Sequence, residues 1–223
     1  MNFKSTDIAF LEKMLSIPKE WFADADYEDW AEIAGRINRF GDLELRCAAR
    51  AILYRRYKLP TSRCWSQFNN ARNVAEIIKN NYDLRAGKKE VLQSANIAMR
   101  KHFGLDEKPI VFRRLDGKFG HAFSRTHVIT INSQIIPIKT IFFLLGVKYH
   151  ENNHILQAVM PEVLGERIPR LSYSARHDYY ITNVHLPIEQ DSKFSEFVFR
   201  TFLRNTKMSD QAIFDKALLY ASR

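Results

Sequence analysis

An apolar stretch that leads into the sequence His-Glu-Asn-Asn-His constrains the fold of this chain more than any other feature. Residues 135–149 read IIPIKTIFFLLGVKY, and His150 to His154 follow directly. The stretch predicts a buried helix over residues 137–159, with Pro137 in the first turn, where its missing N–H costs nothing. Pro161 lies just beyond the predicted end of the helix and would stop it.

His150 and His154 are expected on one face of that helix. Residues four positions apart project from the same side of a helix, so the two imidazoles can bind one metal ion. Glu151 would lie beside the ion, where its carboxylate can accept a proton from water and act as a general base. The spacing therefore predicts a zinc hydrolase and favours a peptidase, an enzyme that cleaves peptide bonds.

A catalytic zinc ion needs three protein ligands and one open position, and the motif supplies two of the three ligands. The extended metzincin pattern is excluded, because Gln157 and Met160 stand where it requires glycine and histidine. We favour His177, because residues 176–181 can form a short helix that faces the first. The other downstream donors that stay open are Glu162, Glu166, His185, Glu189 and Glu196.

Residues 117–181 resemble the SprT-like group of small zinc metallopeptidases and, more loosely, the minimal zincins. The resemblance consists of a glycine-containing strand pair (GKFGHAFSRTHVITIN), a short connection into the helix, the HENNH sequence and a later histidine at position 177. The Asn-Asn pair inside the motif departs from the group. So does the lack of a four-cysteine zinc ribbon in a chain with two cysteines.

This resemblance implies a site and a mode of substrate binding. His150, His154 and His177 would bind Zn²⁺, and Glu151 would be the catalytic base. Residues 127–132 would form an edge strand before the active-site helix. A substrate peptide could then lie antiparallel to that strand, held mainly by backbone hydrogen bonds.

The order of the predicted elements favours an α+β fold. We predict a zincin-like domain over residues 87–223, with a small, mostly antiparallel sheet and an HExxH active-site helix. An all-helical region over residues 1–86 would precede it. The strands are predicted at residues 108–113, 119–123 and 127–132, and the later helices at 88–103, 137–159, 192–203 and 209–221.

The chain is basic, with 34 Lys and Arg against 25 Asp and Glu, and its formal net charge is +9. Basic residues gather at 46–58, 88–101 and 113–125, which predicts a weak, non-specific attraction to DNA or RNA. The basic helices could deliver a peptidase to proteins bound on nucleic acid. Two alternatives stay open: a basic helical nucleic-acid-binding protein with an incidental HENNH, and a zinc hydrolase of non-peptide substrates.

Three features of the sequence favour a cytoplasmic location. The chain has no run of 18 uncharged apolar residues, so we expect no membrane span. The N-terminal residues lack the small-residue cleavage site of a secretory signal. Cys47 and Cys64 are too few and too far apart for a metal knuckle, and as ordinary thiols they suit a reducing compartment. The expected partner is a protein or peptide substrate.

Overall fold

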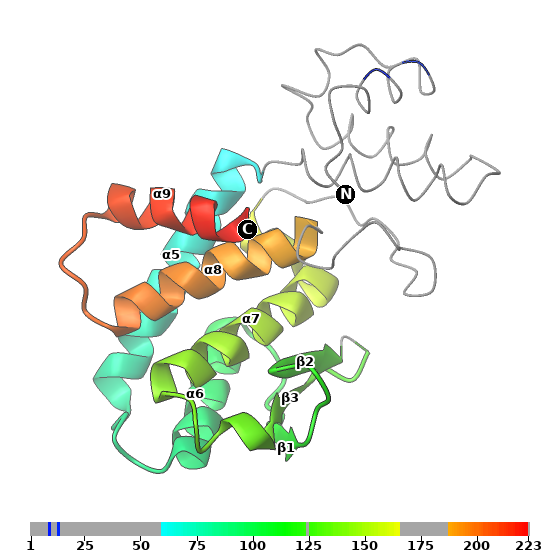
Figure 1. The fold of residues 1–223 in the computed structure, drawn as a ribbon, viewed down its shortest axis with the longest axis vertical. Coiled ribbons are helices and arrows are strands. Elements are labelled where there is room, and N and C mark those ends of the chain that lie inside the picture. The colour runs from blue at the N-terminus through cyan, green and yellow to red at the C-terminus, as the bar shows by residue number, and fades with distance from the viewer. Residues whose placement is uncertain (1–8, 10–12, 14–58, 124, 166–186, 223) are drawn as a thin grey trace. The chain divides into compact units, whose positions relative to one another are not determined.

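The computed structural model describes residues 59–123, 125–165 and 187–222, together with Ala9 and Lys13. The chain divides into two compact units, Met1–Leu59 with Arg167–Gln190 and Pro60–Glu166 with Asp191–Arg223. The fold described below is that of the second unit. It includes the first turn of helix α8, because that turn continues into the rest of the helix without a break (Figure 1). The division predicted from sequence, 1–86 and 87–223, stays a prediction.

Most of the residues described after Leu59 lie in five α-helices, and a small sheet accounts for most of the remaining regular structure. The α+β class predicted from sequence is therefore confirmed for this part of the chain. None of the helices that the structure describes is both long and apolar enough to cross a membrane. The helices are α5 (Thr61–Asn81), α6 (Lys88–His102), α7 (Ile141–Val159), α8 (Pro187–Leu203) and α9 (Asp210–Ala221), with the 3-10 turns η1 (Ser133–Ile135) and η2 (Pro161–Leu164).

The sheet is mixed, so the prediction of a mostly antiparallel sheet is wrong. Its strands are β1 (Val111–Arg113), β2 (Gly120–Phe123) and β3 (Val128–Asn132), in the order β1-β3-β2. Strand β3 pairs parallel with β1 and antiparallel with β2. The short β2–β3 connection produces a hairpin, but the direction of β1 depends on how the longer chain segment between β1 and β2 packs. Residues 127–132 are thus central, and the predicted edge strand there is wrong.

Helix α7 carries the HENNH sequence and begins at Ile141, four residues later than predicted. The Thr140 side chain caps it by accepting a hydrogen bond from the backbone N–H of Phe143, at 3.3 Å. Pro137 lies before the helix, in a separate turn that follows η1, where the N–H of Lys139 donates to the carbonyl of Ile135 at 2.9 Å. A capping threonine with an extended backbone sets the first residue of a helix more strongly than an upstream proline does.

Other helix ends show which local signals are reliable. Helix α6 covers the predicted segment and ends before Gly104, whose φ of +67° suits glycine. Ser209 caps α9 as predicted, accepting a hydrogen bond from the N–H of Ala212. Helix α8 begins at Pro187, five residues before its predicted start, with proline in the position that suits it.

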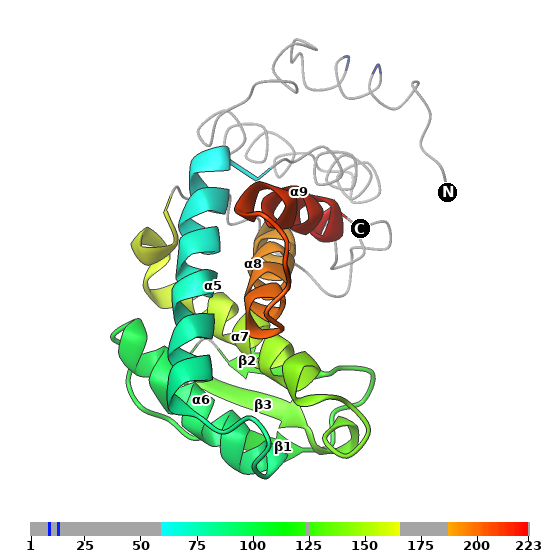
Figure 2. The ribbon, with the colours of Figure 1, turned by 90° about the vertical axis from the view of Figure 1, so that its left-hand side faces the viewer.

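Helix α7 is the central element of the second unit. It contacts strands β2 and β3, and α8 runs beside it (Figures 1 and 2). The rings of Tyr149 on α7 and Phe199 on α8 stack with their centroids 4.4 Å apart, and both side chains are buried. Leu144, Leu145 and Ile155 of α7 are completely buried. The apolar stretch that predicted a buried helix therefore places the HENNH residues between the sheet and α8.

Candidate metal centre

His150 and His154 project together from α7, and their Nε2 atoms lie 3.1 Å apart. The two ring centroids are 4.8 Å apart, and the rings are nearly perpendicular, at 81°. Two nitrogens bound to one tetrahedral zinc ion at about 2.0–2.1 Å are separated by about 3.3 Å. The observed pair is therefore close to the spacing that a shared metal ion requires.

The outer ring nitrogen of each histidine faces an oxygen atom. Nδ1 of His154 lies 2.9 Å from Oε1 of Gln157 and 3.3 Å from the hydroxyl of Ser192. Nδ1 of His150 lies 3.3 Å from Oε2 of Glu196. The Gln157 carbonyl oxygen at Nδ1 of His154 favours the tautomer that carries its proton there, which leaves the lone pair of Nε2 for a metal. The same tautomer of His150 would place two Nε2 lone pairs face to face, an arrangement that favours a cation between them.

A carboxylate completes a group of three donors. Ligand atoms of His150, His154 and Glu189 all lie within 4.8 Å of one another, and this group could hold a metal ion. Glu189 is in the first turn of α8. Two imidazoles and one carboxylate form a donor set that catalytic zinc sites use.

The other sequence candidates for the third ligand have different outcomes. His177, the favoured one, lies outside the described residues, as do His185 and Glu166. Glu162 is exposed on η2, and it is not part of the His150–His154–Glu189 group. Glu196 approaches Nδ1 of His150, on the side of the ring away from His154. Its carboxylate would therefore position the His150 ring rather than bind the metal ion.

Glu151, the predicted general base, lies on the side of α7 that faces β2. It is 9% exposed, and strand β2 approaches it very closely at Gly120. A Cβ atom at position 120 would lie 2.9 Å from both Cγ and Oε1 of Glu151. Glycine is therefore required at this position if the strand and the carboxylate are to lie so close together.

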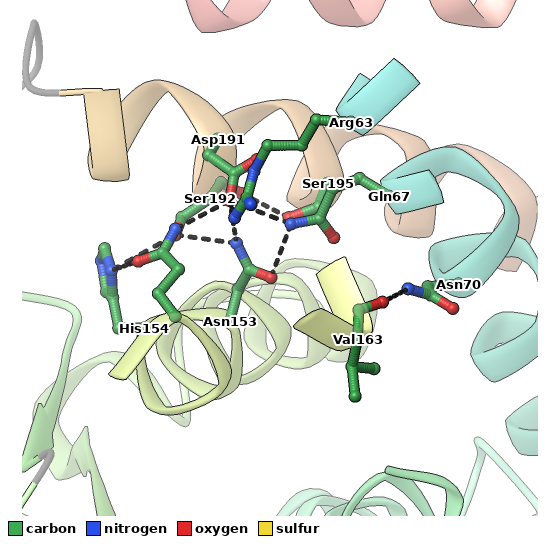
Figure 3. A network of polar contacts seen from close by, with 10 residues as sticks. Arg63, Gln67, Asn70, Asn153, His154, Val163, Asp191, Ser192 and Ser195 are labelled. Carbon is green, nitrogen blue, oxygen red and sulfur yellow. Dashed lines mark hydrogen bonds and ion pairs between the residues drawn. The ribbon is translucent and has the colours of Figure 1, made fainter. Parts of the chain in front are cut away.

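A buried network of polar side chains contacts Nδ1 of His154, the ring nitrogen away from His150 (Figure 3). The amide of Gln157 donates to Oδ2 of Asp191 at 2.8 Å, which turns its carbonyl oxygen towards His154. Arg63 on α5 binds the same carboxylate with two hydrogen bonds of 2.7 Å. The carboxylate charge is thus neutralised in the protein interior, and the orientation of Gln157 is set from α5.

Asn153, one of the two asparagines that departed from the family pattern, belongs to this network. Its side-chain oxygen accepts from Gln67 at 3.0 Å, and its amide donates to Asp191 and to Ser192 at 3.2 and 3.1 Å. The residue is 1% exposed. An apolar side chain here would leave Gln67 and Asp191 short of partners, so the polar residue matches the polar interface between α5, α7 and α8.

Two residues of α8, Glu196 and Arg200, support His150. Nη1 of Arg200 lies 3.1 Å from Oε1 of Glu196, one turn away on the same helix, and the other carboxylate oxygen faces His150. The aliphatic part of Arg200 fills the space beside Gly146, where any Cβ atom would clash with it. Glycine on α7 thus allows the arginine to lie against the helix and to hold the glutamate in place.

His121 on β2 lies close to the positive side chains of Lys118 and Arg113. Burial lowers the pKa of its imidazole, and the positive charges of Lys118 and Arg113 lower it further. His121 is therefore neutral at physiological pH, with its ring edge against Phe123. The sequence analysis did not single out this residue.

The supporting residues Arg63, Asp191 and Arg200 were also not anticipated. Arg63 and Asp191 are 128 positions apart, and nothing local in the sequence indicates that they pair. A weak signal existed in α8, where the polar residues Asp191 and Ser192 come before the aromatic residues of the same helix.

No family model, curated protein or solved structure matches this chain. The function is therefore inferred from the geometry of the site, and the SprT-like resemblance stays a prediction.

Proposed function

We propose that this protein is a zinc-dependent metallopeptidase of the zincin type, as the SprT-like resemblance implies. The observation that carries the proposal is the pair of imidazoles whose Nε2 atoms face each other at 3.1 Å. His150, His154 and Glu189 would hold the ion, and their donor set fits Zn²⁺. His177 is retained as an alternative third ligand.

Each residue of the motif has a separate role in this proposal. When bound, zinc acts as a Lewis acid that makes water easier to deprotonate and polarises the carbonyl of the scissile bond. Glu151 accepts a proton from water and passes it to the leaving amine nitrogen. Because the carboxylate is 9% exposed, it carries out this transfer where little bulk water competes.

The substrate would bind along strand β2 and not along β3, which is paired on both sides. Among the described residues, β2 has one paired edge, so its other edge offers backbone groups to an extended peptide. The close approach of Gly120 to Glu151 would bring such a peptide beside the general base. Because β3 is the central strand, the proposed substrate site lies on β2, which approaches Glu151 of the motif.

The test combines metal content with activity on the full-length protein. We expect about one zinc ion per chain by elemental analysis and zinc-dependent cleavage of an unstructured protein such as casein. His150→Ala and His154→Ala should lose both zinc and cleavage. Glu151→Gln should keep zinc and lose cleavage, whereas Glu162→Gln, an exposed glutamate on η2, should keep both.

Three outcomes would contradict the proposal. If the Glu151→Gln protein still cleaves casein, Glu151 is not the general base. A purified protein without stoichiometric metal, whose affinity for DNA falls steeply with salt, favours the nucleic-acid-binding alternative. Cleavage of esters but of no peptide favours the non-peptide hydrolase. Comparing zinc affinity in Glu189→Gln and His177→Ala then identifies the third ligand, because the true ligand loses far more affinity.

A further inference from the structure

Two exposed aromatic residues lie at the ends of strand β2, and each has a positive side chain over its ring. Phe119, just before the strand, is 52% exposed, with Nζ of Lys139 at 5.9 Å from its ring centroid. Phe123, at the end of the strand, is 37% exposed, with the guanidinium of Arg113 at 5.7 Å. Both pairs have cation–π geometry. Each end of β2 therefore carries a cationic, aromatic site, and Arg113 reaches the Phe123 ring from β1, across β3.

The site at Phe119 is connected to the metal centre through α7 and α8. The Phe119 ring packs edge-on against Phe143 of α7 at 5.2 Å. Lys139 and Arg200 both lie over the Phe143 ring, at 5.2 and 5.3 Å. Phe143 is seven residues before His150, so it lies on the same face of the helix, about 10 Å along the axis. This distance corresponds to about three residues of an extended peptide.

The side chains of β2 and of the chain segments that flank it are positive, apart from the Glu151 carboxylate of α7 that lies against Gly120. Residues 117–127 contain Lys118 and Arg125 and no acidic residue. Asp116, immediately before this segment, is paired with Arg114 at 3.2 Å. Burial is the main cause of the lowered pKa of His121, in the middle of the strand, and the charges of Lys118 and Arg113 add to it. A negatively charged ligand would therefore be attracted to the two ends of the strand, where Lys139 and Arg113 lie over aromatic rings.

We propose that the edge of β2 selects extended peptide segments with acidic side chains on both sides of the scissile bond. This inference rests on the proposed peptidase function and names its substrate class. The peptide backbone would pair with β2, while carboxylates would bind Lys139 at one end and Arg113 at the other. The rings of Phe119 and Phe123 would contact the aliphatic parts of the same side chains.

The strand edge favours a peptide over a nucleic acid as the occupant. Unpaired backbone N–H and C=O groups bind another extended backbone in register, and a sugar-phosphate chain has no matching pattern. Phe119 and Phe123 are four residues apart, about 13 Å along a strand, so a paired peptide would present side chains to both sites in one register. Nucleic-acid binding is nevertheless an outcome that the experiment can reveal.

The experiment uses the full-length, zinc-loaded protein and two pairs of measurements. Cleavage is measured as kcat/KM on matched peptides that carry Glu or Gln at the positions flanking one scissile bond. Binding of the same peptides is measured by fluorescence anisotropy on Glu151→Gln protein, which recognises a peptide without cleaving it. Lys139→Gln and Arg113→Gln remove the two positive charges, and Lys216→Gln, an exposed residue of α9, is the control.

We expect the Glu peptide to be preferred by about two- to fivefold for each acidic side chain, the range of exposed ion pairs, with the preference falling as salt is added. Lys139→Gln and Arg113→Gln should each remove one part of this preference, measured as a lower ratio of kcat/KM for the Glu peptide to kcat/KM for the Gln peptide. Lys216→Gln should change neither. Arg200 is not used as a test, because it also positions Glu196.

The outcomes separate this inference from the proposed function. Zinc-dependent cleavage of Glu and Gln peptides at equal kcat/KM would overturn the acidic preference and leave the peptidase standing. Preferred binding of the Glu peptide without cleavage of any peptide would overturn the peptidase. Tight binding of single-stranded DNA, with no difference between the two peptides, would overturn the acidic preference in favour of a nucleic-acid surface.

Discussion

Arg63 and Asp191 lie on α5 and α8, 128 residues apart, and form a two-hydrogen-bond ion pair in which each side chain is only 1% exposed. Asp191 also accepts hydrogen bonds from the amides of Gln67, Asn153 and Gln157. The pair therefore connects three helices and, through Gln157, one of the proposed zinc ligands.

Replacing Asp191 by Asn should destabilise the fold strongly, because it removes the carboxylate charge that pairs with the buried Arg63 guanidinium. We expect a loss of about 3–5 kcal/mol in the free energy of unfolding, measured with urea. Asp210→Asn is the control, since Asp210 pairs with Arg72 at the surface and should contribute less than about 1 kcal/mol. Equal effects of the two substitutions would refute the structural role of the buried pair.

Glu196 should act on zinc binding through His150. Glu196→Ala removes the oxygen that faces Nδ1 of the ring, and we expect zinc affinity to fall about 10- to 100-fold. Glu196→Gln keeps an oxygen acceptor and should restore most of the affinity. Competition with a zinc chelator measures both variants, and a Gln variant as weak as the Ala variant would contradict the positioning role.

Gly120 should tolerate no side chain without loss of activity. In Gly120→Ala the new Cβ would meet Glu151 and Val147 at 2.9 Å, so Glu151, the proposed general base, must move. We expect kcat to fall at least tenfold while zinc content is unchanged, because His150 and His154 are not touched. Gly87→Ala is a suitable control, since its Cβ would meet only the Glu90 carboxylate at 3.7 Å. Full activity in Gly120→Ala would disprove this placement of Glu151.

The two asparagines of the motif should respond differently to truncation. Asn153→Ala breaks hydrogen bonds to Gln67, Asp191 and Ser192 and should cost about 1–3 kcal/mol. Asn152 is equally buried, but its side-chain amide has no hydrogen-bond partner among the residues that the structure describes. Asn152→Ala should therefore be neutral or stabilising, helped by the higher helix propensity of Ala. Thermal unfolding of both variants measures the difference, and a larger loss in Asn152→Ala would be the contrary result.

Cys64 should be chemically inert in the folded protein. Burial raises the pKa of its thiol to about 12, and the neighbouring Asp191 contributes to the rise. The thiol stays protonated at pH 8, so alkylation by iodoacetamide should be undetectable before unfolding and complete after it. Because the folded state holds this proton more tightly, its stabilising contribution is lost as the pH rises above 9.0. Peptide mass spectrometry distinguishes Cys64 from Cys47.

Local signals in the sequence predicted the elements well. The apolar spacing indicated α7, the four-residue spacing placed His150 and His154 on one face, and Gly104 and Ser209 marked helix ends that the structure bears out. Each of these depends on residues within one or two turns of chain. The start of α7 was missed because the Thr140 cap competes with Pro137, and periodicity alone does not rank such signals.

The sequence pattern did not predict which segments far apart in the chain pair with each other. Alternation along residues 127–132 indicates a strand and its two faces, but not that β3 lies between a parallel and an antiparallel neighbour. The amino-acid sequence by itself determined the helix and the two imidazoles that it presents. Only the tertiary structure decided that Glu189 joins them, that Gly120 lies against Glu151, and that Arg63 neutralises Asp191. These contacts depend on the packing of elements far apart in the chain, which local periodicity does not encode.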